Sequence, residues 1–452
     1  MSSTKEMDMT RGPVLRQMVK FGIPVFFGMI FQRIYNFADV YIVGHYLGDE
    51  ALAAVSIAGT VMFLLLALNT GVTTGVGVVL SQYFGGNKQE EMKKAYVASA
   101  IVAVGVTVLI TGIGLLTAEP LLRLMQTSDE LMPYAKDYLV IIYIGCVGTM
   151  LYNFSASVLR AVGNSVIPLV FLIVSSVLNI VLDIIFIAVI PLGTAGAALA
   201  TVVAQMISGL LCMIYAKKIL AFMKVKREEW QMDFVLIKEI LKYAIPATVQ
   251  MSIITISDMT LQAVINTYGT AMIVAYGVCL KVEGIGWELT TAVGSAVGTF
   301  TGQNVGAKNM ERTKKGIRCA HLLNIIATGA FGVIIYITAP FIMKAFTESA
   351  EAIRYGVEYM RIFSCFFFFG GLVVVFQYFL RFAGDVLFTL LMGVSEVITR
   401  IGLALFLPGV VGYVGLWFVS PVTWTVAAIV GMVRYYSNTW VKKAEKIGES
   451  YQ

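Results

Sequence analysis

Stretches of about twenty or more apolar residues recur along the whole chain of 452 residues. Each is long enough to cross the ~30 Å hydrocarbon core of a bilayer as an α-helix, a structure that bonds its own backbone polar groups. We count twelve such stretches, and each predicts one transmembrane helix. They lie near residues 15–42, 51–81, 92–118, 131–158, 166–190, 193–216, 237–264, 272–301, 316–340, 352–380, 387–408 and 412–437.

The composition agrees with a chain whose solvent is lipid. Hydrophobic residues make up 58% of the sequence and charged residues 13%, and the mean hydropathy is +0.82. Soluble domains carry roughly 25% charged residues, so a water-exposed surface does not fit this chain. The polar N-terminal stretch leads directly into an apolar segment too long for a signal-peptide core, so we expect the first helix to stay in the membrane.

The cysteines indicate neither a metal site nor a disulfide framework. No two of the five have CxxC spacing, and all lie in or beside apolar stretches. We therefore interpret them as reduced packing residues. They are Cys146, Cys212, Cys279, Cys319 and Cys365.

The placement of the basic residues predicts the orientation. A formal net charge of +6 could indicate a nucleic-acid partner. However, 25 of the 33 Lys and Arg residues lie at the two termini and in the even-numbered connections, against four in the odd-numbered ones. By the positive-inside rule both termini lie in the cytoplasm, which twelve spans permit. We therefore expect a multi-pass protein of the cell membrane with no nucleic-acid partner.

The two halves of the sequence resemble each other at a shift of about 220 positions. Residues 15–216 align with residues 237–437 through four short motifs. The paired motifs are residues 20–24 and 242–246, 82–85 and 303–306, 159–164 and 380–385, and, more weakly, 193–196 and 412–415.

The repeat predicts the domain organisation. Each half has six helices, so both halves start from the same face of the membrane. The predicted fold is therefore an all-α integral membrane protein with twelve transmembrane helices in two six-helix lobes, related by a pseudo-twofold axis along the membrane normal. The lobes are residues 1–216 and 237–452, and residues 217–236 form a cytoplasmic linker. Parallel repeats commonly place a substrate site between the halves near the midplane.

Polar residues interrupt the apolar segments of the first half at helical spacing. In the first segment four polar residues lie on one helix face at i, i+3, i+4 and i+7. Burying such a face against lipid would be unfavourable. Asn179 and Asp183 in the fifth segment, and Thr201 and Gln205 in the sixth, repeat an i, i+4 spacing. The four residues of the first segment are Gln32, Tyr35, Asn36 and Asp39.

These side chains supply the hard oxygen ligands that a small cation prefers. The same group could carry a proton instead, because two carboxylates in a poorly hydrated pocket disfavour double ionisation. A third interpretation is a satisfied interhelical hydrogen-bond network that exchanges no ion.

The second half is polar in a different pattern. Its candidates for contact with a substrate are Asp258, Gln262, Lys281, Glu288, Glu396 and Arg400, and the first half adds Gln32, Tyr35, Asn36, Asn153 and Gln205. Glu396 and Arg400 have the i, i+4 spacing of an internal ion pair. For the charged residues, structural pairing competes with substrate contact. No role is assigned to Arg33 and Arg361.

Proline indicates a hinge in the first helix. Pro24 and Pro246 occupy equivalent places in the two halves, where the missing N–H and the ring allow a kink. Because the first helix also carries Asp39, we hypothesise that cation occupancy changes the bend at Pro24.

The order and spacing of these motifs resemble the multidrug and toxic compound extrusion (MATE) family over nearly the whole chain. The resemblance rests on residues 37–44, 48–54, 82–85, 159–164, 196–201 and 303–306, and on Asn179 with Asp183. It implies twelve helices in two lobes, a V-shaped cavity, and export of drugs or toxic metabolites by alternating access and antiport with Na⁺ or H⁺.

Carried over residue by residue, the family's cation site falls on Asp39, Asn179, Asp183 and Thr201, where Na⁺ could bind. The acidic position of the seventh helix falls on Asp258. An acidic position of the tenth helix in some members is Gly370 here, so a second complete cation site is not expected. No cofactor is expected besides the coupling ion, and we expect a monomer.

Other functions fit the sequence less well. A long basic cavity or extra helices would favour a flippase for a lipid-linked saccharide. A membrane receptor or scaffold that binds ligand without moving it would usually carry a soluble domain. An enzyme is not expected, because the sequence has no nucleophile–base pair, phosphate loop or metal cluster.

Overall fold

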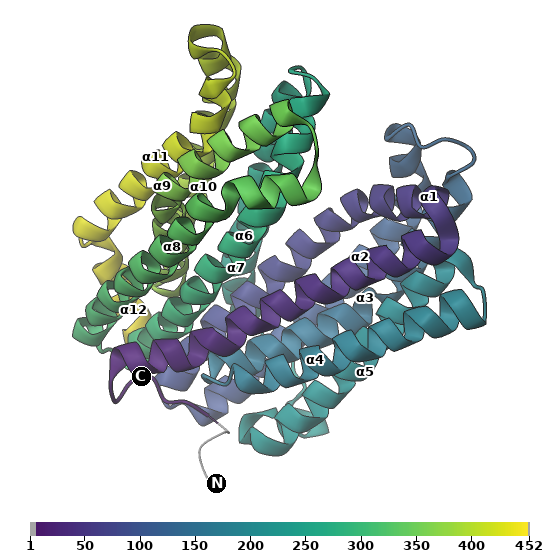
Figure 1. The fold of residues 1–452 in the computed structure, drawn as a ribbon. Coiled ribbons are helices and arrows are strands. Elements are labelled where there is room, and N and C mark those ends of the chain that lie inside the picture. The colour runs from purple at the N-terminus through teal and green to yellow at the C-terminus, as the bar shows by residue number, and fades with distance from the viewer. Residues whose placement is uncertain (1–5, 451–452) are drawn as a thin grey trace. The chain divides into compact units, whose positions relative to one another are not determined.

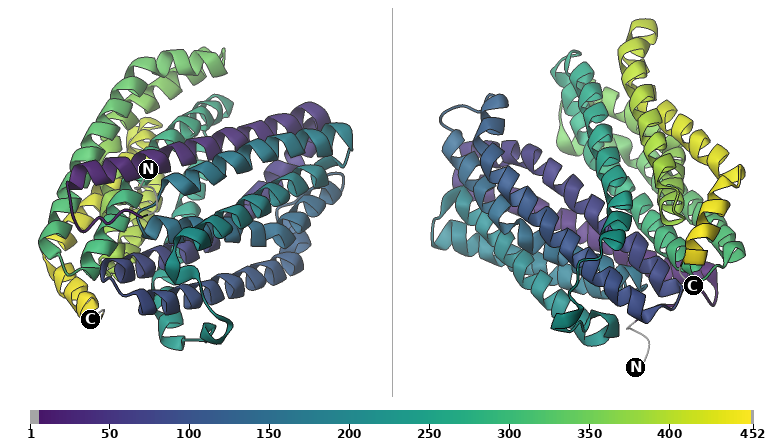
Figure 2. Two further views of the ribbon diagram at one scale, coloured as in Figure 1. Left: turned by 90° about the horizontal axis from the view of Figure 1, so that it is seen from below. Right: turned by 180° about the vertical axis from the view of Figure 1, so that it is seen from behind.

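The computed structural model describes residues 6–450, except for the side chains of residues 63–66 and 450, and every regular element in it is a helix (Figures 1 and 2). The α-helices are α1 Val14–Gly85, α2 Gln89–Leu124, α3 Met132–Ala161, α4 Val166–Asp183, α5 Gly193–Ile219, α6 Phe234–Asn266, α7 Thr270–Gly306, α8 Met310–Phe346, α9 Ala350–Phe382, α10 Val386–Val411, α11 Val414–Tyr436 and α12 Thr439–Ser450. A π-helical turn, Ile184–Val189, extends α4, and two 3₁₀ turns, Ala221–Met223 and Arg227–Glu229, precede α6.

The predicted membrane architecture is confirmed. In the part of the chain that the structure describes, 11 helices have the length and hydropathy to cross a membrane. One of them, α1, contains two limbs, because the backbone leaves the helical region at Gly48 (φ 82°, ψ −175°) and the chain turns back, as Figure 1 shows. The two limbs of α1 and the ten helices α2–α11 match the twelve predicted segments.

The repeated motif at residues 159–164 and 380–385 forms the same helix end twice. Gly163 and Gly384 adopt φ values of +82° and +89°, which residues with a Cβ rarely adopt. In the first half the amide of Asn164 donates to the carbonyl of Leu159 at 2.9 Å, and the equivalent bond in the second half measures 2.8 Å. Such bonds close a helix in the Schellman manner. The repeat in sequence is therefore also a repeat of backbone geometry.

Contacts divide the chain into two compact units. Unit 1 comprises the chain up to Asp8 together with Phe27–Thr248, and unit 2 comprises Met9–Phe26 together with Val249–Gln452. Because α1 and α6 are continuous helices, each begins in one unit and ends in the other. The units thus correspond to the sequence halves except that the first parts of α1 and α6 are exchanged. The predicted boundaries at residues 216 and 237, and the axis relating the lobes, stay predictions.

The exchanged parts of α1 and α6 pack against equivalent positions of the sequence repeat. In unit 1 the α6 residues Ala244 and Thr248 contact Gly71 of the second limb of α1. In unit 2 Gly22 of α1 faces Ala292 and lies beside Ala296 of α7. Position 292 is the repeat equivalent of position 71, so the exchange is reciprocal.

Helices α3 and α5 approach closely through small residues. A Cβ added to Gly148 of α3 would lie 2.9 Å from the backbone nitrogen of Met206, and one added to Gly209 of α5 would lie 2.9 Å from that of Tyr152. Glycine lets two helix backbones come this close in a membrane. The contact fixes the position of α5 along the axis of α3, and α5 carries Thr201 and Gln205.

The connection between α5 and α6 is fastened to α2. Nζ of Lys93 lies 2.6 Å from Oε1 of Glu229, and this ammonium partner lowers the pKa of the Glu229 carboxyl. The segment predicted as a linker is shorter than expected, because α5 continues to Ile219 and α6 already begins at Phe234.

Replacing Gly148 with Leu should destabilise unit 1 by about 1–3 kcal/mol, because the new side chain cannot fit between the α3 and α5 backbones. Thermal unfolding of the purified protein in detergent measures the loss. Gly112→Leu on α2 is the matched control, since a Cβ at Gly112 meets nothing within 4 Å. Equal unfolding temperatures for the two variants would contradict this account of the packing.

Candidate functional site

Asp39 and Asp183 bring two carboxyl groups together inside unit 1. Asp39 lies on the first limb of α1, and Asp183 is the last residue of α4; their carboxyl groups interact with each other directly. Asp183 is completely buried. Among the described residues, neither oxygen of Asp183 has a hydrogen-bond donor, nor does Oδ1 of Asp39. Buried carboxylates without donors need a bound proton or cation to offset the cost of desolvation.

Asn179 and Thr201 add neutral oxygens to this pair. Asn179 lies one helical turn before Asp183 on α4, and its Nδ2 donates to Oγ1 of Thr201 on α5 at 3.3 Å. This bond leaves Oδ1 of Asn179 without a donor in residues 6–450. The structure thus assembles Asp39, Asn179, Asp183 and Thr201, which we call the four-residue site, and its chemistry suits a hard cation or a proton.

Two tyrosines flank the four-residue site. The hydroxyl of Tyr35, one turn before Asp39, interacts with the side chains of Gln32 and Gln205. Tyr138 of α3 is buried and interacts electrostatically with both Asp39 and Asp183. Tyr138 was not among the predicted site residues, because a lone tyrosine in an apolar helix has no periodic polar pattern around it.

Apolar residues adjacent in sequence to the four-residue site belong to one buried cluster of unit 1. The cluster includes Ile42 and Val43, one turn beyond Asp39, together with Ala197 and Ala198 of α5. Ile187 of the π-helical turn after Asp183 belongs to the same cluster. Such surroundings keep the local dielectric low and strengthen every charge interaction at the site. π-Helical turns within helices are often found at functional sites.

The remaining candidates of unit 1 have other surroundings. Nδ2 of Asn153 donates to the carbonyl of Thr149 in its own helix at 2.9 Å. Asn36 is exposed on α1, and Arg33 is half-buried on the same helix.

Unit 2 contains an ion pair between Arg400 of α10 and Asp258 of α6. Nη1 of Arg400 donates to Asp258 and, at 3.1 Å, to Oγ of Ser257. The i, i+4 spacing of Glu396 and Arg400 allows an ion pair within α10, but the Arg400 guanidinium bonds to α6 and interacts with Glu396 only through its charge. Glu396 instead accepts a hydrogen bond of 2.9 Å from Gln377 of α9.

A further buried carboxylate lies near this pair. Glu283 of α7 is 7% exposed and accepts a hydrogen bond from the hydroxyl of Tyr359 on α9. It interacts electrostatically with both Asp258 and Arg400. Glu283 was not among the predicted cavity residues, and its partner Tyr359 lies on another helix, which spacing along α7 cannot show. Asp258, Glu283 and Glu396 of unit 2 thus have donors, whereas Asp183 and Oδ1 of Asp39 in unit 1 lack them.

The other residues singled out in unit 2 have varied surroundings. Nε2 of Gln262 donates to Oδ1 of Asn266 at 2.7 Å on α6. Lys281 is exposed and Glu288 half-buried on α7. The guanidinium of Arg361 lies 5.2 Å from the ring centroid of Tyr336, a cation–π contact that accounts for this intramembrane charge.

A family model matches the chain in two segments, residues 24–185 and 246–406, and is described as MatE. The chain belongs to the MatE family. The two matched segments start at Pro24 and Pro246, which agrees with the repeat found in the sequence. The predicted resemblance to multidrug and toxic compound extrusion transporters is therefore confirmed.

Known proteins of this family resemble the chain over most of its length. It is 31% identical to the "Probable multidrug resistance protein YpnP" of Bacillus subtilis over 85% of this chain and 86% of the relative. A structure titled as the outward-facing conformation of a multidrug resistance MATE family transporter aligns with a TM-score of 0.90 at 24% identity, covering 98% of this chain and 100% of the other.

A second solved structure has the same fold. It is a transporter of the MOP superfamily from Pyrococcus furiosus, and its title states that reversed polarity of the binding pocket suggests a different function. It aligns with a TM-score of 0.90 at 24% identity and covers 97% of this chain and 98% of its own. The residues of the site, rather than the fold, must therefore carry the argument about function.

Replacing Arg400 with Met should destabilise unit 2 by about 1 kcal/mol, because Asp258 loses its counterion but keeps contact with solvent. Adding Asp258→Asn to that variant should restore part of the loss. Thermal unfolding of the purified variants measures both effects. Arg361→Met is the control, with only a small expected change; a double variant no more stable than Arg400→Met would contradict the pairing.

Proposed function

We propose that this protein is a secondary active exporter of amphiphilic or cationic small molecules, driven by antiport with Na⁺ or H⁺ through alternating access. The observation that carries the proposal is the four-residue site, where carboxylates without donors lie in an apolar surrounding. Binding of a positive ion stabilises such a site, and release of the ion destabilises it. Coupling requires this difference in free energy. The names of the relatives support the substrate class.

In the proposed cycle the four-residue site exchanges a cation with one side of the membrane at a time. Uptake of a proton or Na⁺ neutralises one of the charges on Asp39 and Asp183. Asn179 and Thr201 supply neutral oxygens around the ion, and Tyr138 lies close enough to respond to the change in charge. The free-energy difference between the two charge states can then bias the conformation that the transporter adopts.

The substrate contact is proposed for unit 2. The Asp258 side chain keeps 57% of its surface exposed although Arg400 pairs with it. An organic cation could therefore approach this carboxylate and weaken the ion pair, with aromatic residues adding apolar contact. Gln262, Lys281, Glu288 and Glu396 remain proposed neighbours of the substrate.

The proposed setting is the cell membrane, with both termini in the cytoplasm and the protein acting as a monomer. The proposal excludes an enzymatic role and any cofactor besides the coupling ion. The excess of basic residues at the termini and in the even-numbered connections supports the orientation.

Asp39→Asn and Asp183→Asn should each abolish gradient-driven efflux, because an amide can neither release a proton nor balance the charge of Na⁺. Ethidium efflux from everted vesicles, with Na⁺ and pH gradients imposed separately, measures the loss at matched expression. Asp137→Asn, an exposed carboxylate of α3, is the control and should transport normally. Normal coupling in both test variants would reject the proposed site, and ethidium transport without either gradient would reject antiport.

Pro24→Ala should reduce efflux severalfold while leaving expression and cation binding intact, because the bend of α1 becomes harder to change. Pro24 lies two residues before the point where α1 passes from unit 2 into unit 1. Initial efflux rates in the same vesicles provide the measurement. Pro340→Ala in α8 serves as the control, and unchanged efflux for Pro24→Ala removes the hinge hypothesis.

A further inference from the structure

A basic cavity of about 730 Å³ lies at the start of α8 in unit 2. Arg312, Lys315 and Arg318 line it, together with a single lining carboxylate, Glu311. Lys314 lies 3.4 Å from that carboxylate and offsets its charge. The cavity therefore carries an excess of positive charge that attracts an anion.

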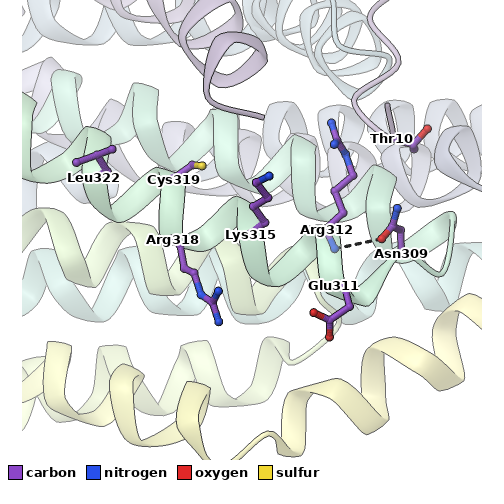
Figure 3. A pocket seen from close by; sticks show the side chains of 8 residues that line it. All are labelled: Thr10, Asn309, Glu311, Arg312, Lys315, Arg318, Cys319 and Leu322. Atoms are coloured by element: carbon purple, nitrogen blue, oxygen red, sulfur yellow. Dashed lines mark hydrogen bonds between the residues drawn. The ribbon is translucent and has the colours of Figure 1, made fainter. Parts of the chain in front are cut away.

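The N-terminal segment of the chain forms one wall of the cavity, and Arg312 holds it in place. The Arg312 guanidinium donates to the carbonyls of Met9 and Arg11 and to Oε1 of Gln17, at 2.8–3.0 Å. Figure 3 shows Thr10 next to Arg312 at the end of the row of side chains. Because these bonds occupy its guanidinium, Arg312 shapes the wall, whereas Lys315 has no ion-pair partner among the described residues.

The side chains along α8 change from basic to apolar in one stripe. Figure 3 shows Arg312, Lys315, Cys319 and Leu322 projecting from the same side of the helix, while Glu311 and Arg318 project from the other side. Their spacing places them in one row along the helix. Ile326 continues the row one turn later; Leu322 and Ile326 are 47% and 59% exposed.

This order matches the structure of a phospholipid at the membrane surface. A membrane-spanning helix passes from the headgroup region into hydrocarbon within a few turns, because it rises 1.5 Å per residue. The exposed apolar residues beyond Leu322 therefore mark the start of the hydrocarbon, and Lys315 lies about one to two turns outside it. Basic pockets at this level are suited to acidic lipid headgroups.

We propose that this cavity binds an anionic glycerophospholipid, with its phosphate beside Lys315 and an acyl chain along Cys319, Leu322 and Ile326, while Arg318 adds positive charge from the other side of the helix. The lipid belongs to the leaflet that the basic residues assign to the cytoplasm. Its phosphate neutralises positive charge that no carboxylate lining the cavity balances. Its acyl chain covers apolar side chains that otherwise face the bilayer at large.

Binding is tested on the full-length protein in nanodiscs of phosphatidylcholine with or without phosphatidylglycerol. Native mass spectrometry counts the retained phosphatidylglycerol, and maleimide labelling followed by peptide mapping reports the exposure of Cys319. We expect phosphatidylglycerol to be retained and to slow labelling of Cys319. Labelling of Cys365, an exposed thiol on α9, should stay constant in the same molecules.

Variants identify the residues that hold the lipid. Lys315→Gln should weaken retention about fivefold, the factor for one basic residue at an anionic surface, and Arg318→Gln, on the other side of the helix, should weaken it less. Lys442→Gln removes the same charge from exposed α12 and should change nothing. Equal losses for Lys315→Gln and Lys442→Gln would overturn the proposal, because retention would then follow total charge.

Two further experiments distinguish binding of the lipid from binding of a free phosphate ion. Leu322→Asn should reduce retention of the lipid, whereas it leaves the cationic side chains in place. Inorganic phosphate, added to nanodiscs of phosphatidylcholine alone, should leave Cys319 labelling unchanged. Protection by inorganic phosphate equal to that by phosphatidylglycerol would overturn the lipid assignment. None of these measurements depends on transport, so they succeed or fail independently of the proposed export function.

Discussion

The pair of carboxylates in unit 1, with Asp183 buried and Asp39 half-buried, is the constraint on which the rest of the account depends. Asp39 and Asp183 interact with each other, yet their buried oxygens lack donors within the described chain. Water would solvate such charges in a soluble protein, but the surrounding cluster is apolar. The pair is therefore stable only with a compensating positive ion. The close approach of α3 and α5 at Gly148 holds Thr201 and Tyr138 around it.

Unit 2 balances its buried charge in another way. Arg400 pairs with Asp258, Gln377 donates to Glu396, and Tyr359 donates to Glu283. The same repeated architecture thus produces two different electrostatic environments. The close approach of α3 and α5 through Gly148 and Gly209 shows that packing of small residues also positions the helices of unit 1.

The sequence predicted the twelve segments because apolar length alone decides them, and it predicted the repeat because short motifs mark helix ends. The i, i+4 spacing also placed Asn179 and Asp183 on one face. Spacing along one helix cannot show which side chains a neighbouring helix brings close. For this reason the pairing of Arg400 with Asp258 and the position of Tyr138 beside the carboxylates were not predicted. The exchange of the first parts of α1 and α6 was equally invisible, because it depends on packing between distant segments.

Infrared difference spectroscopy of the purified protein tests the central claim most directly, because it detects a protonated carboxyl group without requiring transport. The account predicts a band from a buried protonated carboxyl that disappears when pH is raised or Na⁺ is added, and that is absent from Asp183→Asn. A spectrum that responds to neither ion, or that is unchanged in Asp183→Asn, would show that the pair binds no exchangeable cation and would contradict the account.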